Sequence, residues 1–126
     1  SRGHTMAKQK ILAVDDERHI LELISYNLQG AGYQVETAET GEQALRCYEA
    51  SSPYSYDAIL MDIRMPEMDG AEATRRIREF CPAIPIIAVT ANAFDEDRRR
   101  AFEAGVDDFL TKPLSKAKLF ETINRY

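Results

Sequence analysis

Five polar residues stand where predicted strands end: Asp15 and Asp16, Asp62, Thr90 and Lys112. In an open parallel sheet, ligands collect at the carboxyl ends of the strands, so side chains distant in the sequence can meet there. Three carboxyl groups, a hydroxyl and an ammonium suit a magnesium-dependent phosphoryl site, because Mg²⁺ prefers oxygen ligands and contacts phosphates. The same groups do not suit a hydrophobic core. The sequence therefore predicts a phosphoryl-transfer pocket at one edge of a sheet.

Asp62 is the candidate nucleophile of this pocket. A carboxylate oxygen can attack a phosphoryl group and form an aspartyl phosphate. Such a transfer depends on positioning and on neutralising the charge of the equatorial oxygens. Lys112 supplies a positive charge there, and Thr90 supplies a hydroxyl donor. Backbone N–H groups near Arg64 and Ala91 complete the oxygen cage. The bond before Pro113 fixes the bend that aims the lysine, and it can be cis.

Asp15, Asp16 and Asp62 follow the first and third predicted strands, which are neighbours in the proposed sheet. Two carboxylates about 4 Å apart repel by roughly 4 kcal/mol at an effective dielectric constant near 20. Such a cluster holds either protons or a cation, and we expect Mg²⁺. Each residue alone has a plainer interpretation: the first two acids as helix caps, Lys112 as a solvated lysine and Thr90 as a strand former. Their placement at successive strand ends favours the shared site.

The elements that must position these residues are visible as alternating strand and helix patterns. Short apolar runs such as Ile86–Val89 are typical of strands buried on both faces. Apolar residues at helical spacing, with capping residues ahead of them, indicate helices between the strands. The predicted strands are Lys10–Val14, Tyr33–Ala38, Ala58–Met61, Ile86–Thr90 and Asp108–Thr111; the predicted helices are Arg18–Ala31, Asp95–Ala104, Lys116–Arg125 and two that begin after Thr40 and Asp69.

Five strand–helix units in succession predict an α/β fold, with a parallel sheet covered by helices on both faces. Right-handed crossovers leave few topologies, and the doubly wound, flavodoxin-like order 2-1-3-4-5 fits best. This order places Tyr33–Ala38 and Asp108–Thr111 at the sheet edges, in agreement with their more polar patterns. The 126 residues predict one domain. Ser1–Thr5 lacks apolar periodicity, and we expect it to be a tag or a frayed tail.

Composition argues against several functions. The net charge of −5 is unsuited to a nucleic-acid surface, which needs a basic face. No apolar stretch approaches the ~20 residues of a membrane span, and no secretion signal is visible. Cys47 and Cys81 form no CxxC pair, so we expect reduced thiols in a cytoplasmic protein. No glycine-rich loop follows the first strand, which argues against a dinucleotide cofactor.

At the residues described above, the chain closely resembles the receiver domain of two-component response regulators, the CheY-like family. The resemblance extends from about Lys8 to Arg125, within a receiver domain at residues 6–126. Motifs of this length in this order are highly specific. The matching motifs are ILAVDDE at 11–17, MDIRMPEMDG at 61–70, VTA at 89–91, AGVDDF at 104–109 and TKP at 111–113. The resemblance implies a regulatory phosphoacceptor of a phosphorelay, not an enzyme with its own substrate.

The resemblance also implies a role for each residue of the pocket. Asp62 corresponds to the phosphoacceptor. Asp16, Asp62 and the backbone carbonyl of Arg64 would ligate Mg²⁺, and Asp15 would help through a water molecule. Lys112 corresponds to the lysine that contacts the phosphoryl group.

Thr90 and Phe109 correspond to the switch residues of the family. The phosphoryl oxygens would draw the Thr90 hydroxyl inward and open space for the ring of Phe109. The implied donor is a histidine kinase or a histidine phosphotransfer protein. The last two helices and the last strand would carry the output. There, Arg98–Arg100 with Asp107 and Asp108 would support a homodimer, or else form a solvated face. We expect neither nucleic acid nor membrane as a partner of this domain.

Two other functions stay open on the sequence. A haloacid-dehalogenase-like phosphatase also uses an aspartate nucleophile and Mg²⁺, but it usually places a second aspartate two residues later, where this chain has Arg64. A module that only docks partners would share the fold, although a charged acid cluster without a cation would be unfavourable. Glu17, next to the acid pair, is expected to be solvated.

Overall fold

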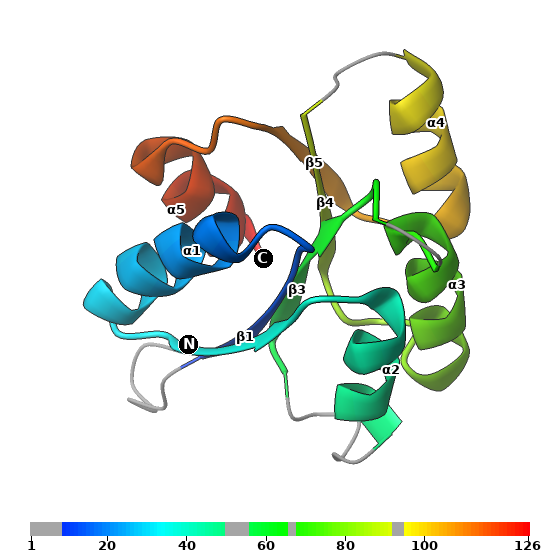
Figure 1. The fold of residues 1–126 in the computed structure, drawn as a ribbon, viewed down its shortest axis with the longest axis horizontal. Coiled ribbons are helices and arrows are strands. Elements are labelled where there is room, and N and C mark those ends of the chain that lie inside the picture. The colour runs from blue at the N-terminus through cyan, green and yellow to red at the C-terminus, as the bar shows by residue number, and fades with distance from the viewer. Residues whose placement is uncertain (1–8, 50–55, 66–67, 92–94) are drawn as a thin grey trace.

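A central sheet with helices on both faces forms the body of the protein (Figure 1). The structure is a computed structural model and describes residues 9–49, 56–65, 68–91 and 95–126. Within these ranges the strands are β1 (Lys10–Val14), β2 (Gln34–Ala38), β3 (Ala58–Asp62), β4 (Ile86–Thr90) and β5 (Asp108–Thr111). The helices are α1 (Arg18–Gly30), α2 (Gly41–Glu49), α3 (Gly70–Phe80), α4 (Asp95–Ala104) and α5 (Lys116–Arg125).

The strands are parallel and lie in the order β2-β1-β3-β4-β5. This order confirms the flavodoxin-like α/β fold predicted from the sequence. The register pairs Val14 of β1 with Met61 of β3, and Thr90 of β4 with Thr111 of β5. Because these strand ends lie side by side, the residues at and just beyond them emerge at the same edge of the sheet.

The two faces of the sheet are covered by different helices. Leu12 and Ile59 belong to a core cluster with residues of α2, α3 and α4, whereas Ile11 and Leu60 belong to a cluster with residues of α1 and α5. Figure 1 shows the same division, with α1 and α5 on one side of the strands and the other three helices on the opposite side. Neighbouring residues alternate between the two clusters, as strand geometry requires.

Three boundaries differ from the prediction by one residue. Asp62 is the last residue of β3 and pairs with Val89 of β4, so the polar side chain does not end the backbone ladder. β2 begins at Gln34, because Tyr33 bonds back to the end of α1 instead of joining the sheet. α1 ends at Gly30, and Gly32 follows with φ of 100°, a conformation that favours glycine.

Ser115 caps α5, since its hydroxyl accepts the N–H of Lys118 at 3.1 Å. The capping box ahead of α2 is formed in part. Thr40 accepts the N–H of Gln43 at 3.0 Å, but the Gln43 side chain accepts from the N–H of Glu39 instead of closing back on Thr40.

Ser1–Thr5, the predicted tail, lies outside the described residues, as do Pro66 and Glu67 of the second motif. Across the part of the chain that the structure describes, none of the helices has the length and apolar character needed to cross a bilayer. Cys47 and Cys81 carry free thiols, in agreement with the expectation.

Candidate functional site

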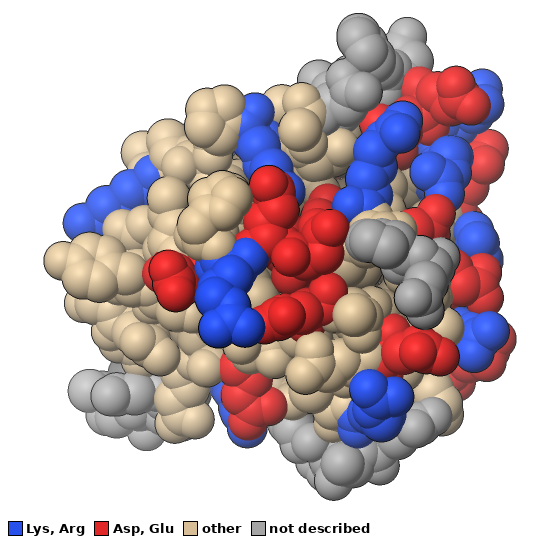
Figure 2. All heavy atoms as spheres, in the orientation of Figure 1, with Lys and Arg blue, Asp and Glu red and all other residues tan. Residues whose placement is uncertain are grey.

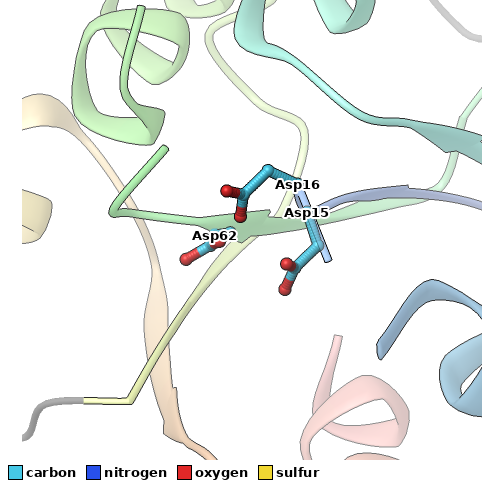
Figure 3. Close-up of side chains that lie close together, drawn as sticks. All are labelled: Asp15, Asp16 and Asp62. Carbon is cyan, nitrogen blue, oxygen red and sulfur yellow. The ribbon is translucent and has the colours of Figure 1, made fainter. Parts of the chain in front are cut away.

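Three carboxyl groups meet at the carboxyl ends of β1 and β3 (Figure 3). Asp15 and Asp16 follow β1 directly, and Asp62 ends β3. One oxygen from each residue lies within 4.8 Å of the others. Asp15 and Asp62 are buried, at 1% and 3% exposure, whereas Asp16 is open to solvent. The structure thus brings together the acids that the sequence placed at one edge of the sheet.

The environment of Asp62 disfavours its charged form. Burial, and after it the negative charge of Asp15, raises the pKa of Asp62 to about 8. The charge of Lys112 and a hydrogen bond from the Arg64 backbone N–H to Oδ1, at 3.2 Å, act in the opposite direction without cancelling the rise. In the absence of another cation, the Asp62 carboxyl therefore holds a proton near neutral pH.

A close approach of α3 fixes the backbone at Asp62. Gly70, the first residue of α3, donates its N–H to the carbonyl of Ile63 at 3.0 Å. A Cβ atom on Gly70 would lie 2.0 Å from the carbonyl oxygen of Asp62 and 2.9 Å from the Cα of Ile63. Only glycine fits this contact. The preceding residue, Asp69, caps α3 by accepting the N–H of Glu72 at 3.0 Å, as the sequence predicted.

Lys112 enters the acid cluster from the residues after β5. Its Nζ lies 3.0 Å from Oδ2 of Asp15, 3.1 Å from Oε1 of Glu17 and 3.7 Å from Oδ2 of Asp62. Burial opposes the charge of Lys112, but the hydrogen bonds to Asp15 and Glu17 and the charge of Asp62 together outweigh burial and raise its pKa. The prediction that Glu17 is merely solvated was wrong, because its half-exposed side chain accepts a hydrogen bond from the lysine.

Thr90 closes the pocket on the β4 side. It is 1% exposed, and its carbonyl accepts the backbone N–H of Lys112 at 2.8 Å, which holds the lysine-bearing segment against β4. The Lys112–Pro113 peptide bond is cis. Figure 2 shows acidic side chains gathered at the centre of this face with basic side chains around them. A pocket of about 290 Å³ is lined by Asp16, Glu17, Asp62, Arg64, Thr90, Ala91 and Lys112.

Two ion pairs that sequence reasoning missed connect the segment after β3 to α4. The Arg64 guanidinium donates to the Asp97 carboxylate twice, from Nε to Oδ2 at 3.0 Å and from Nη2 to Oδ1 at 2.8 Å. Arg100 pairs with Asp69 at 2.5 Å between Nη2 and Oδ2. The partners are 33 and 31 positions apart in the sequence, so no helical or strand spacing signals either pair.

Phe109 lies on β5, opposite Ala88 of β4. Its ring is partly buried and packs against the core cluster beneath α2, α3 and α4. The guanidinium of Arg98, on α4, lies over the ring at 5.8 Å from its centroid. The aromatic side chain therefore stands at the boundary between the core and the outer face of α4.

The charged residues that the sequence suggested for a dimer, Arg98–Arg100 with Asp107 and Asp108, have partners within the chain. Arg100 pairs with Asp69, as described, and the Arg98 guanidinium covers the Phe109 ring. A dimer held by these charges would have to compete with the existing pairs. The other pairs are Arg99 with Glu103 at 3.9 Å, Arg78 with Asp107 at 2.8 Å and Arg125 with Asp108 at 2.6 Å.

The acid cluster suits a divalent metal ion. The carboxyl groups of Asp15, Asp62 and Glu17 lie within 3.7 Å of the Lys112 ammonium group, and the carboxyl group of Asp16 lies with those of Asp15 and Asp62. The burial of Asp62 beside Asp15 makes the unbalanced negative charge unfavourable, which is the reason for the raised pKa. Carboxylate oxygens that leave one side open to solvent can hold a hard cation that keeps some water ligands, and a phosphate oxygen can replace one of these waters.

The sequence matches the family model of the response regulator receiver domain over residues 11–124. Among curated proteins, the hybrid signal transduction histidine kinase L of Dictyostelium discoideum is 43% identical over 122 residues. That alignment covers 93% of this chain and 7% of the kinase, so the chain spans a small fraction of the length of this relative.

Two solved structures show the same fold with similar sequences. The receiver domain of the sensor histidine kinase PA1611 from Pseudomonas aeruginosa, determined with a magnesium ion coordinated in its active site cleft, is 43% identical, with a TM-score of 0.86 and coverage of 95% of this chain and 98% of that one. The chemotaxis protein CheY4 of Vibrio cholerae is 34% identical, with a TM-score of 0.88 and coverage of 94% and 98%.

Proposed function

Because the chain belongs to the response regulator receiver domains, which are regulatory phosphoacceptors of two-component signalling, we propose that Asp62 accepts a phosphoryl group from a histidine kinase or a histidine phosphotransfer protein. The environment of Asp62 carries the proposal. It is a buried carboxyl at a strand end, with an ammonium group 3.7 Å away and two further acids within 4.8 Å. This set supplies a nucleophile, a fixed positive charge and the ligands for a cation.

The transfer forms one bond and breaks one. A carboxylate oxygen of Asp62 attacks the phosphorus, the P–N bond to the donor histidine breaks, and its electron pair stays on the imidazole nitrogen. Asp62 must be ionised to attack, so its raised pKa has to fall when positive charge enters the pocket. Lys112 is placed to balance charge on the equatorial oxygens, because its Nζ already lies between Asp15 and Asp62.

We assign the metal ligands to Asp15, Asp16, Asp62 and the backbone carbonyl of Arg64, and we expect the ion to be Mg²⁺. When bound, the ion neutralises charge on the acids and on the phosphoryl oxygens. The backbone of Arg64 is already oriented at the pocket, since its N–H donates to Oδ1 of Asp62. A magnesium ion in the cleft of the similar PA1611 receiver domain supports this assignment.

Thr90 and Phe109 are the proposed switch. The Thr90 hydroxyl would donate to a phosphoryl oxygen on Asp62, and the Phe109 ring would turn into the space that Thr90 leaves. The ring is well placed for such a change, because it stands between the core and Arg98 on α4. Phosphorylation then biases an equilibrium between two packed arrangements, and the surface of α4, β5 and α5 reports the outcome.

That surface is also the proposed place of a homodimer. The ion pairs of Asp107 with Arg78 and Asp108 with Arg125 lie within the chain and compete with pairing across such an interface. These pairs favour the alternative interpretation of the sequence, in which this charged surface is solvated and forms no dimer interface. The net charge of −5 supports a protein partner over nucleic acid.

A phosphatase of the haloacid-dehalogenase type receives no support from the site. Its acid/base position, two residues after the nucleophile, holds Arg64, whose guanidinium is engaged by Asp97. Arginine does not exchange protons near neutral pH. Multiple-turnover hydrolysis of a small phosphate ester, lost in Asp62→Asn, would restore this alternative.

The experiment uses beryllofluoride with Mg²⁺, which mimics an acyl phosphate. We expect NMR shifts of the backbone amides at Thr90 and Phe109 in the unmutated domain and none of these shifts in Asp62→Asn. Mg²⁺ alone should shift the amides next to Asp15 and Asp16. A domain that binds Mg²⁺ and ignores beryllofluoride would contradict the proposed phosphoacceptor, and one that binds neither would be a docking module.

A further inference from the structure

We propose that Arg64 is a positioning residue that holds α4 in place until Asp62 carries a phosphoryl group, and that its guanidinium then moves from Asp97 to the phosphoryl oxygens. The ion pair between Arg64 and Asp97 is called the α4 latch below. This inference rests on the proposed function, because it requires a phosphorylated Asp62. It goes further by naming the group through which phosphorylation reaches α4.

Arg64 belongs to both regions that the latch connects. Its backbone N–H donates to Oδ1 of Asp62 at 3.2 Å, inside the phosphoryl pocket. Its side chain makes two hydrogen bonds with Asp97, the third residue of α4. The residue also lines two adjacent hollows, the phosphoryl pocket and a second one of about 370 Å³ that is formed with Asp69 and Arg100. A rotation of one side chain can therefore exchange partners without moving the backbone of β3.

The two members of the latch differ in their freedom to move. The side chain of Arg64 is 64% exposed, whereas that of Asp97 is 2% exposed. Asp97, buried on α4, is therefore the fixed partner, and Arg64 is the mobile one. A buried carboxylate that loses its cation is strongly destabilised, so departure of the guanidinium must be followed by a shift of the first turn of α4.

A phosphoryl group on Asp62 creates a second acceptor for the same guanidinium. It brings roughly two negative charges and three acceptor oxygens next to the Arg64 backbone. Guanidinium groups bind phosphate through two parallel hydrogen bonds, the same geometry that Asp97 now satisfies. Lys112, held by Asp15 and Glu17, is the other cation at this pocket among the described residues. The phosphoryl group therefore competes with Asp97 for Arg64.

The second connection between the same segments lets α4 move without detaching. Arg100 pairs with Asp69, which caps α3, and neither side chain lines the phosphoryl pocket. This pair lies one helical turn beyond Asp97 and keeps the middle of α4 in place. Release of Asp97 is then expected to open the first turn of α4, on the side where Arg98 covers Phe109.

The test measures beryllofluoride affinity in the presence of Mg²⁺ for the unmutated domain, Asp97→Asn, Arg64→Gln and the double variant. Asp97→Asn removes the competing charge, so we expect affinity to rise about fivefold or more. Arg64→Gln removes the cation that the phosphoryl group gains, so we expect affinity to fall by a similar factor. The effect of Asp97→Asn should disappear in the Arg64→Gln background, because the guanidinium for which Asp97 and beryllofluoride compete is then absent.

Hydrogen exchange gives an independent readout in the absence of beryllofluoride. The amides of the first turn of α4 should exchange faster in both single variants than in the unmutated domain. Glu103→Gln and Arg99→Gln are matched controls, since they make the same charge changes on the exposed side of α4. They should change neither the affinity nor the exchange rates, and thermal unfolding confirms that each variant is folded.

The outcomes separate the two proposals. If the unmutated domain does not bind beryllofluoride at Asp62, the proposed function fails and this inference fails with it. If the unmutated domain binds and both single variants lose affinity equally, the latch is only a structural ion pair and the inference alone is overturned. An Asp97→Asn gain that persists without Arg64 would also overturn it, because the effect would be general electrostatics.

Discussion

The two sides of Asp62 use charge in different ways. On the β1 and β5 side, three acids share Lys112, and burial together with the negative charge of Asp15 raises the pKa of Asp62 to about 8. On the α3 and α4 side, charges are matched one to one, in the pairs of Arg64 with Asp97 and Arg100 with Asp69. The first side is prepared for an incoming cation and phosphoryl group. The second side holds the backbone and the helices in place.

The difference shows that an ion pair cannot be interpreted from its residue types alone. Lys112 and Arg64 are both cations that line the pocket of Asp62. Lys112 places its charge inside the pocket, whereas Arg64 contributes its backbone N–H to the pocket and its charge to a neighbouring helix. The two cations differ in the place of their buried partners. The partners of Lys112, Asp15 and Asp62, lie at the edge of the sheet, whereas the partner of Arg64, Asp97, lies on α4.

The largest effect is expected from the unbalanced side, as a dependence of stability on pH. The pKa of Asp62 rises from 3.8 to about 8 on folding, so the folded domain binds one more proton than the unfolded chain between these values. Without divalent ions, the free energy of unfolding should therefore fall as pH rises from about 4 to about 8. The upper limit is about 6 kcal/mol, at ~1.4 kcal/mol per pKa unit.

Chemical denaturation at a series of pH values measures this slope. Asp62→Asn should flatten the profile and raise stability near pH 8, whereas Glu121→Gln, on the exposed face of α5, should leave the slope unchanged. Mg²⁺ should stabilise the domain more at pH 8 than at pH 5, because metal binding requires the ionised carboxyl. If the free energy of unfolding of Asp62→Asn depends on pH as steeply as that of the unmutated domain, the burial of Asp62 is not the cause of the pH dependence.

The next effect concerns the α3 and α4 side, where the packing of α3 against the backbone of Asp62 matters more than charge. Gly70→Ala forces a methyl group to within 2.0 Å of the Asp62 carbonyl oxygen, so the free energy of unfolding should fall by about 3 kcal/mol. The rate of phosphorylation should fall as well, because the Asp62 backbone has to shift. Gly30→Ala is the control, since no atom lies within 4 Å of its Cβ position, and it should leave stability equal or higher. Equal stability of the two variants would remove the packing argument.

The sequence was sufficient to predict the fold and, apart from Glu17, the residues around Lys112 and Asp62. The alternation of strand and helix patterns, with the rule of right-handed crossovers, predicted the sheet order. The positions of Asp15, Asp62, Thr90 and Lys112 at strand ends predicted that these residues meet in one pocket. The pairing of Arg64 with Asp97 was not predictable, because long charged side chains choose partners by three-dimensional position and leave no periodic signal. Glu17 was misjudged for the same reason, since its partner Lys112 lies 95 residues away.

The smallest expected effect concerns the competition for Lys112. Glu17→Gln weakens one of the two hydrogen-bonded acids that hold Nζ away from Asp62, at 3.1 Å against 3.7 Å. The rate of phosphorylation by acetyl phosphate should rise by about two- to fivefold, the range expected for a partly exposed ion pair. Glu22→Gln, on the exposed side of α1, should have no effect. A slower reaction in Glu17→Gln would mean that Glu17 assists the lysine and does not compete for it.

The central claim is that Asp62 accepts the phosphoryl group, and mass spectrometry of the intact domain tests it most directly. After incubation with acetyl phosphate and Mg²⁺, the unmutated domain should gain the mass of one phosphoryl group, located by fragmentation at Asp62. Asp62→Asn should gain none, although its fold is retained. A phosphoryl group on another residue of the unmutated domain, or undiminished labelling of Asp62→Asn, would contradict the account.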